Sequence, residues 1–394
     1  MRQAQIELFG LKADALRLVL RNSPPGGWFP ALQELFWAVE EANIPYCPIF
    51  FSPQLRRVHL FTNWRGDPTA PPDLSAVASA VSQLPASTLK LLNLHVRFIW
   101  FSSLPFEESA SSLVLRCGPS LTRFSTRTQL SDEALNHLVQ LPYLDTVLID
   151  CPPPRCPGTS FPPIFPRLKK LSLGKAGAHG WLSLFGQLEN GISAVQGVMP
   201  LSRMKKSLVT LKIITAPAPG IDAAFTSVLQ IFQNLAILNL DHVCHEDEED
   251  DQCKFTLNDN DVTELAMALP RLRTLILGYP CAANTCATTI ACLLPISVHC
   301  VGLESLSIHF NTRNIAKDLE TAFEDPRFQE LRLLPRCPLG QLRTFDMTLS
   351  LDESGFETVV NGMVDIFPSL NCCEGNQKIW STLSTRIVDN RAGG

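Results

Sequence analysis

One arrangement of apolar and polar residues recurs along the chain, and it is clearest between Leu257 and Gly278. The first half of this stretch has apolar residues at spacings of three, four and seven: Val262, Leu265, Ala266 and Leu269. Such spacing predicts an apolar stripe on a short helix, which Pro270 would end. The second half, Leu272 to Leu277, has the form L-x-x-L-x-L, which predicts a short strand with one apolar side. Neither half can bury its apolar side alone, so the stretch predicts a unit that is stable when copies of it stack.

The strand form occurs eleven times, with other apolar residues in place of some leucines. The first leucines of these hexamers are Leu32, Leu55, Leu89, Leu121, Leu144, Leu168, Leu208, Leu235, Leu272, Leu303 and Leu342. Successive first leucines are 23 to 40 residues apart, so the period is loose. Six hexamers have a proline two residues before the first leucine, where it ends a preceding helix and favours an extended chain. These prolines are Pro30, Pro53, Pro119, Pro142, Pro166 and Pro270.

The segments between the hexamers predict helices, because apolar residues recur there at helical spacing. Such segments are Asp73–Leu84, Asp132–Leu141, Ile221–Phe232 and Phe356–Phe367. A strand followed by a returning helix, many times over, predicts an α/β fold. Its parallel strands would form the concave face of a horseshoe-shaped solenoid, and its helices the convex face. We expect this irregular solenoid over residues 29–370, with a cap or remnant at 1–28 and a carboxyl-terminal cap and tail at 371–394 that frays from about Ile387.

The repeat resembles leucine-rich repeats. Its loose period, its Pro-x-Leu entry and the phrases FPALQELFW and LSDEALNHLVQLPYLDTVLID are similar to those of fungal F-box/leucine-rich-repeat proteins. The resemblance covers roughly Phe29 to Leu370 and implies a leucine-rich-repeat horseshoe that recognises substrates for a ubiquitin ligase. Regular repeats of this kind have Asn or Cys three residues after the last leucine of the strand. Only Asn63 and Asn311 stand at that place here, so we expect irregular turns.

The same resemblance raises the question of whether the chain binds the Skp adaptor. In that family a three-helix F-box binds the Skp adaptor of a cullin ubiquitin ligase. Residues 1–28 contain one candidate helix, Leu8 to Leu20, which is too short for an F-box, so these residues do not predict Skp binding. The chain is then either a shortened relative or the substrate-recognition half of a longer gene product.

Alternation along each strand assigns the third and fifth residues of every hexamer to the concave face. In the last hexamer these residues are Thr344 and Asp346. Seven residues of this face form the candidate partner-binding site: Phe36, Arg57, His59, Arg123, Lys170, Lys212 and Asn239. The four cations among them suggest a groove for a protein substrate or peptide that is acidic or phosphorylated, with Phe36 as a flanking apolar contact. The alternative is that all seven are ordinary solvated positions on a polar surface.

Charge and composition narrow the class of protein. The formal charge is −5, but the acidic run Glu246–Asp251 alone supplies −6, so the rest of the chain carries about +1. Such a balance lacks the basic excess of nucleic-acid-binding proteins. No apolar stretch of about 18 residues occurs, so we expect no membrane partner. The 13 cysteines, an odd number, predict reduced and mostly buried thiols, and no N-x-S/T acceptor occurs, which favours a cytoplasmic or nuclear location.

No catalytic pattern is found. The chain has no G-x-S-x-G, H-E-x-x-H or G-x-x-x-x-G-K-[S/T] motif, so we expect no enzyme and no cofactor. His242, Cys244, His245 and Cys253 lie close together in sequence, but they lack a C-x-x-C pair, so we expect no metal site.

Two loops are candidates for other contacts. Residues 151–166 are rich in proline and predict an extended loop, and residues 245–251 predict a solvated acidic loop. These loops leave a second interpretation open. The chain could be a structural scaffold or adaptor, without any link to a ubiquitin ligase, that binds through the loops instead of the groove.

Overall fold

The computed structural model describes a subset of the chain: residues 3–6, 18–19, 21–22, 24, 28–39, 46, 48–62, 74–95, 104–149, 167–176, 206–215, 229–242, 257–278, 287–308, 311, 314–339, 341–344, 353–370, 372–374 and 378–393. The chain forms two compact units. The amino-terminal unit comprises residues 1–174 and 187–204, and the carboxyl-terminal unit comprises residues 175–186 and 205–394.

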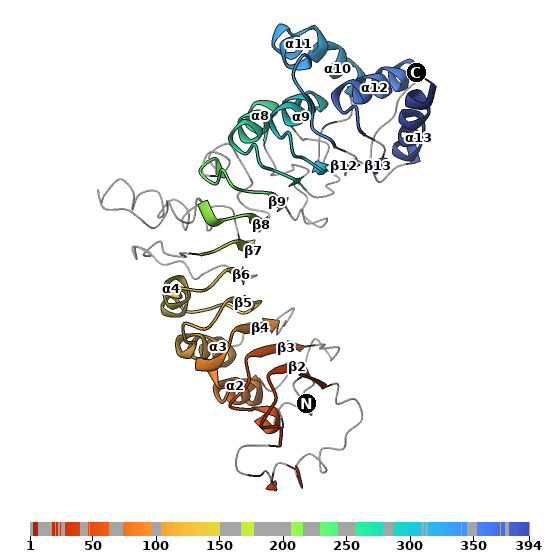
Figure 1. Ribbon diagram of the computed structural model, residues 1–394. Helices are drawn as coiled ribbons and strands as arrows, with labels where there is room; N and C mark the ends of the chain where they lie inside the picture. Colours follow the sequence, from red (N-terminus) through yellow and green to blue (C-terminus); the bar gives the residue numbers. More distant parts are fainter. Residues whose placement is uncertain are drawn as a thin grey trace, which may run out of the picture. The chain divides into compact units, whose positions relative to one another are not determined.

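The amino-terminal unit has a parallel sheet in which each strand lies beside the strand that precedes it in sequence. Its strands are β1 (Gln3–Ile6), β2 (Glu34–Val39), β3 (Arg57–Thr62), β4 (Leu91–His95), β5 (Arg123–Thr126), β6 (Thr146–Ile149) and β7 (Lys170–Ala176), which ends just beyond the unit boundary. The described helices of this unit lie along one side of the sheet (Figure 1): α2 (Leu74–Ser82), the 3-10 helix η2 (Ala86–Thr88), α3 (Leu104–Arg116) and α4 (Asp132–Gln140).

The carboxyl-terminal unit is built in the same way, from parallel strands in sequence order. Its strands are β8 (Thr210–Thr215), β9 (Ile237–His242), β10 (Thr274–Leu277), β11 (Ser305–Ile308), β12 (Gln341–Thr344) and β13 (Cys372–Glu374). Its described helices are α8 (Asp259–Ala268), η3 (Ile290–Cys292), α9 (Leu293–His299), α10 (Ile315–Glu324), α11 (Pro326–Arg332), α12 (Glu353–Ile366) and α13 (Lys378–Gly393). Both units are therefore α/β with parallel sheets, as the hexamer pattern predicts. None of the described helices is long and apolar enough to cross a membrane.

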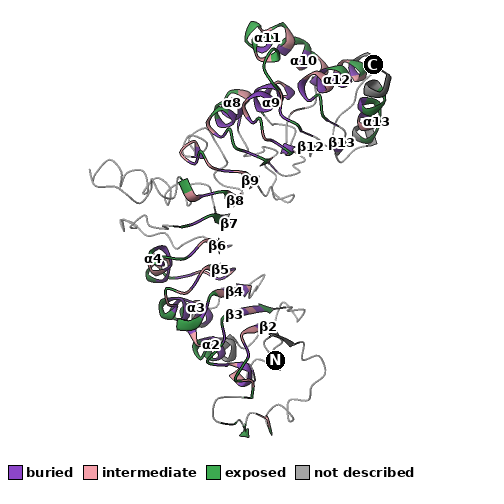
Figure 2. Ribbon diagram, viewed as in Figure 1, coloured by how far each residue is buried: buried purple, intermediate pink, exposed green. Residues whose placement is uncertain are grey.

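Buried leucines explain why the hexamers become strands. In the hexamer from Leu89, the first, fourth and sixth residues are fully buried, whereas Leu91 and Asn93 between them are partly exposed. Figure 2 shows the same alternation of buried and intermediate positions along the strands. Each strand thus places one side against the helices and presents the other side away from that core.

Local signals set the helix ends. The side chain of Ser131 accepts a hydrogen bond from the backbone N of Ala134 and begins α4. A capping box begins α8, because Asn258 and Asp261 each accept a hydrogen bond from the other's backbone N–H. Pro270 follows directly on the C-cap residue of α8, as the sequence predicts.

The predicted register is wrong at one strand. Ten of the eleven hexamers begin a strand at their third residue, but β12 begins at Gln341, before Leu342. Leu342 pairs with Leu306, the fourth residue of its own hexamer, so the repeat there starts at the buried Leu339. Gln341 and Arg343 therefore occupy the third and fifth positions, in place of the predicted Thr344 and Asp346. The cause is a second leucine three residues earlier, which fits the same pattern equally well.

Further differences lie at the two ends of the chain. Strand β1, within the residues 1–28 that were expected to form a cap or remnant, pairs with β2, and the hexamer pattern did not predict this strand. Strand β13 follows the buried Leu370 and places the buried Cys373 where other repeats have leucine. The prediction that the tail frays from about Ile387 is wrong, because Ile387 is fully buried in α13.

Helix α13 also contacts β13, and the backbone N of Cys373 donates a hydrogen bond to Ser384 Oγ in α13 at 3.3 Å. The predicted loops at 151–166 and 245–251 lie outside the described residues. So do most of the predicted helices Leu8–Leu20 and Ile221–Phe232.

Candidate functional site

The side of the amino-terminal sheet away from the described helices carries two rows of side chains, and we call it the open face. Strand pairing fixes both rows. The first row is Glu34, Arg57, Leu91, Arg123, Thr146 and Lys170; the second is Phe36, His59, Asn93, Ser125, Leu148 and Ser172. Neighbours along a row are about 4.8 Å apart, the spacing of paired strands. All twelve residues are intermediate or exposed.

At one end of the open face, an aromatic pair lies beside a carboxylate. The rings of Phe36 and His59 stack with centroids 4.2 Å apart and an interplanar angle of 10°. Glu34 Oε1 lies 3.6 Å from Arg57 Nη1 and 4.0 Å from His59 Nε2. Burial lowers the pKa of His59, although Glu34 opposes this shift. The imidazole is therefore mostly neutral at neutral pH, and the stacked rings form a flat, weakly polar surface beside the Glu34–Arg57 ion pair.

Cations occupy alternate strands of the first row. Arg57, Arg123 and Lys170 lie on β3, β5 and β7, so consecutive cations are two strand spacings, or about 10 Å, apart. Arg57 is paired with Glu34. Arg123 and Lys170 are exposed and form no ion pair with another described residue. Their charges are thus available to an anionic ligand.

The second row contains a buried acceptor. Asn93 Oδ1 is shielded from solvent and has no hydrogen-bond partner. Further along, Ser125 Oγ lies 2.5 Å from Nε2 of His95. An unsatisfied buried acceptor costs about 1 to 3 kcal/mol, so Asn93 is a locally unfavourable position under the open face.

The other two predicted site residues belong to the carboxyl-terminal unit. Lys212 on β8 and Asn239 on β9 are neighbours across the strand pair. Lys212 Nζ lies 3.5 Å from Asp241 Oδ2. Burial raises the pKa of Asp241, and Lys212 opposes that shift. The predicted set of seven is therefore divided, with Phe36, Arg57, His59, Arg123 and Lys170 in one unit and Lys212 and Asn239 in the other.

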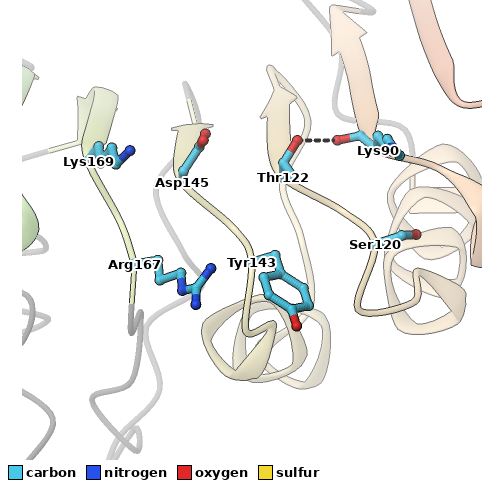
Figure 3. A pocket seen from close by; sticks show the side chains of 7 residues that line it. All are labelled: Lys90, Ser120, Thr122, Tyr143, Asp145, Arg167 and Lys169. Carbon is cyan, nitrogen blue, oxygen red and sulfur yellow. Dashed lines mark hydrogen bonds between the residues drawn. The ribbon is translucent and has the colours of Figure 1, made fainter.

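A second candidate lies where the strands of the amino-terminal unit begin. Seven residues line a hollow of about 400 Å³, which we call the strand-start hollow: Lys90, Ser120, Thr122, Tyr143, Asp145, Arg167 and Lys169. Figure 3 shows Lys90, Thr122, Asp145 and Lys169 in a row at the beginnings of β4 to β7. The other three lie on the segments that lead into these strands (Figure 3).

The sequence signal for this hollow is the pair of residues that flank each first leucine. Leu121, Leu144 and Leu168 are fully buried, and both neighbours of each line the hollow. Sequence reasoning missed them because it considered only the third and fifth residues of each hexamer.

The backbone holds the row of the strand-start hollow in place. The N–H groups of Thr122, Asp145 and Lys169 each donate to the carbonyl of the preceding row member, and each bond is 2.8 Å long. The hydroxyl of Thr122 also donates to the Lys90 carbonyl, at 2.9 Å. Arg167 lies over the ring of Tyr143, with its Cζ atom 5.1 Å from the ring centroid. The backbones of the row members therefore keep a fixed spacing.

Cysteines and histidines form no recognisable chemical centre in the described part of the chain. Five of its cysteines are buried thiols: Cys117, Cys292, Cys300, Cys337 and Cys373. Burial raises the pKa of Cys117 and of Cys300 to about 12, so these two thiols are poor nucleophiles at neutral pH. The described residues include no group of three potential metal ligands. Of the predicted His/Cys cluster, only His242 is described, at the end of β9.

Fold and site together define an α/β protein with parallel sheets and, in its amino-terminal unit, an open polar face. A scan of the chain against protein-family models gives no match, and a search of curated proteins gives none either.

Proposed function

We propose that the chain is an irregular leucine-rich-repeat solenoid that acts as a non-catalytic protein-binding module in the cytoplasm or nucleus. The open face of the amino-terminal unit is the observation that supports this proposal. Parallel sheets are normally covered on both faces, whereas solenoids leave one face available as an extended binding surface. Here the described helices lie along one side of the sheet, and exposed or partly exposed side chains, most of them polar, occupy the other.

The ligand that fits this face is an acidic or phosphorylated segment of a protein. Arg123 and Lys170 offer charges that no described residue neutralises, and charge-assisted hydrogen bonds are about twice as strong as neutral ones. The stacked Phe36 and His59 offer a flat contact for an apolar side chain.

The resemblance to fungal F-box/leucine-rich-repeat proteins suggests that the partner is a substrate of a ubiquitin ligase. Membership of a ligase is a separate part of the proposal, and a pull-down with the Skp adaptor tests it. Retention of the adaptor by the purified chain would support membership, and an empty pull-down would remove it while leaving the protein-binding role intact.

The competing proposal is a scaffold or adaptor that binds through residues 151–166 or 245–251. Site-specific photocrosslinking separates the two. A photoreactive residue at Ser125, on the open face, is compared with one at Ser112, an exposed position on α3. We expect a partner to crosslink from Ser125 and not from Ser112, and Arg123→Glu/Lys170→Glu to abolish that crosslink. Crosslinks that arise only from probes in the two loops would favour the scaffold.

A further inference from the structure

We propose that the strand-start hollow is a second docking surface, which binds an extended acidic segment of the partner protein. This inference rests on the proposed function and adds the location and charge pattern of a distinct contact. Lys90, Arg167 and Lys169 are exposed and supply three positive charges to the hollow, against one negative charge from Asp145. Lys90 and Lys169 form no ion pair with another described residue, so their charge is available to a ligand.

The length of the hollow selects an extended ligand. Lys90 and Lys169 precede β4 and β7, so three strand spacings, or about 14 Å, separate their backbones. An extended peptide advances about 3.3 Å per residue, so four to five residues cover this distance. A run of carboxylates can therefore meet both lysines, whereas one compact anion is a poorer match because the two lysines stand at opposite ends.

Asp145 sets the charge pattern that the ligand needs. It lies between Thr122 and Lys169 in the row, and its Oδ1 accepts a hydrogen bond from Thr146 Oγ1 at 2.8 Å. A ligand carboxylate placed opposite Asp145 would be repelled, whereas an amide or hydroxyl there could donate to its remaining acceptor sites. The preferred segment has acidic residues at both ends and a neutral hydrogen-bonding residue between them.

The Tyr143–Arg167 pair gives the hollow a rigid wall. Tyr143 is 50% exposed, and the guanidinium of Arg167 lies over its ring. A guanidinium held against an aromatic ring has fewer orientations to lose when it binds a carboxylate, so less entropy opposes binding.

Two peptide probes test the inference on the full chain. The first is fluorescein-labelled hexaglutamate, and the second is Glu-Glu-Gln-Gln-Glu-Glu with the same label. Fluorescence anisotropy at about 50 mM salt gives both affinities, because screening is weak there. We expect both probes to bind and the probe with the neutral centre to bind about threefold more tightly.

Charge reversal locates the binding site of the probes. Lys90→Glu/Lys169→Glu should lower the affinity of the chain for both probes by about tenfold or more. The matched control is Lys206→Glu/Lys317→Glu, which makes the same charge change at exposed positions of the carboxyl-terminal unit and should alter affinity less than twofold. All four side chains are exposed, and circular dichroism with thermal melting checks that both variants fold.

Asp145→Asn tests the charge pattern. This variant should bind hexaglutamate about threefold more tightly, because the repulsion at the centre of the hollow is gone. The difference in affinity between the two probes should then disappear. Equal affinity of the two probes for the unmodified chain would overturn the proposed pattern.

Other results would overturn the docking surface itself. These are equal losses in the control variant, no binding of either probe, or tighter binding of a labelled hexauridine than of either peptide, which would point to nucleic acid. The crosslink from Ser125 keeps the two proposals apart. If that crosslink is unchanged in Lys90→Glu/Lys169→Glu and the probes are also unaffected, the inference fails while the proposed function stands.

Discussion

The two units use the same repeat but present different charges on the equivalent face. In the amino-terminal unit, Arg123 and Lys170 are exposed and have no ion-pair partner among the described residues. In the carboxyl-terminal unit, Lys212 is neutralised by Asp241 on the neighbouring strand. Ser307, at the fifth position of its hexamer, is only 5% exposed, and its hydroxyl has no hydrogen-bond partner.

This difference shows that a cation at the right repeat position is not yet a binding residue. Whether the charge of such a cation is available to a partner depends on the residues that the adjacent strand places beside it. Asp241 lies just beyond its hexamer, opposite Ile214, and so stands diagonally across from Lys212. The amino-terminal unit is therefore the better candidate for binding an anionic partner, and the following experiments test the contrast.

The largest expected effect concerns the buried leucine core, which both units have. Leu92→Ala in β4 and Leu275→Ala in β10 each remove a fully buried side chain from the core. Each should lower the free energy of unfolding by about 2 to 5 kcal/mol, because a cavity adds to the lost burial. Urea denaturation measures both. A loss below about 1 kcal/mol in one variant would show that its unit is packed less tightly than the other.

The next effect concerns the open face directly. Arg123→Gln/Lys170→Gln should weaken binding of the partner captured from Ser125 by about tenfold, because two available charges are lost. Lys212→Gln should change it less than twofold, because Asp241 already neutralises that charge. Titration of the purified partner by isothermal calorimetry measures both variants. A larger effect from Lys212 would reverse the contrast between the units.

Helix capping allows a smaller comparison. Asn258→Ala removes a side chain that accepts from the backbone N of Asn260 at 2.9 Å and of Asp261 at 3.1 Å. Ser131→Ala removes a single, longer acceptor bond of 3.3 Å. We expect losses of about 1 kcal/mol for α8 and about 0.5 kcal/mol for α4 in urea denaturation. Equal losses would mean that the second bond of the α8 cap adds nothing.

The smallest effect is a dependence on pH. The folded-state pKa of His59 is lowered, so below about pH 6.5 the unfolded chain binds a proton that the folded chain does not. This contribution to stability is present above that pH and is lost as the pH falls through the lowered pKa. His59→Gln should therefore reduce the difference between urea midpoints at pH 7.5 and pH 5.5.

Asp241→Asn is the matched control in the other unit. The folded-state pKa of Asp241 is raised from 3.8, so its contribution is present at low pH and is lost as the pH rises through the raised value. Because this contribution changes with pH in the sense opposite to that of His59, the control should not reduce the difference between urea midpoints at pH 7.5 and pH 5.5. An effect as large as that of His59→Gln would contradict the assignment to His59.

Most strands could be predicted from the sequence because a buried leucine at the first position, followed by buried and mostly apolar residues at the fourth and sixth, is a strong and local signal. The signal fails where two leucine phases overlap, as at Leu339 and Leu342, and where cysteine replaces leucine, as at Cys373. Helix α13 was missed because its buried residues, such as Leu383 and Ile387, are sparse among polar ones.

The candidate sites were less predictable than the strands. Period-two alternation correctly placed Arg57, Arg123 and Lys170 in one row. It could not show that Asp241 neutralises Lys212, because an ion pair depends on register and side-chain reach. It also gave no reason to examine residues before the strands, although the two neighbours of a buried leucine are the signal for the strand-start hollow.

The contact between α13 and β13 bears on the edge of the carboxyl-terminal sheet. A sheet that ends on a bare parallel strand can recruit a strand from another molecule and extend into a ribbon of many chains. Here Ser384 Oγ accepts a hydrogen bond from the main-chain N–H of Cys373, so this donor is not open to a strand of another molecule. Ser384 therefore engages one main-chain donor of the described edge strand β13, and it does so from a helix and not by adding a strand.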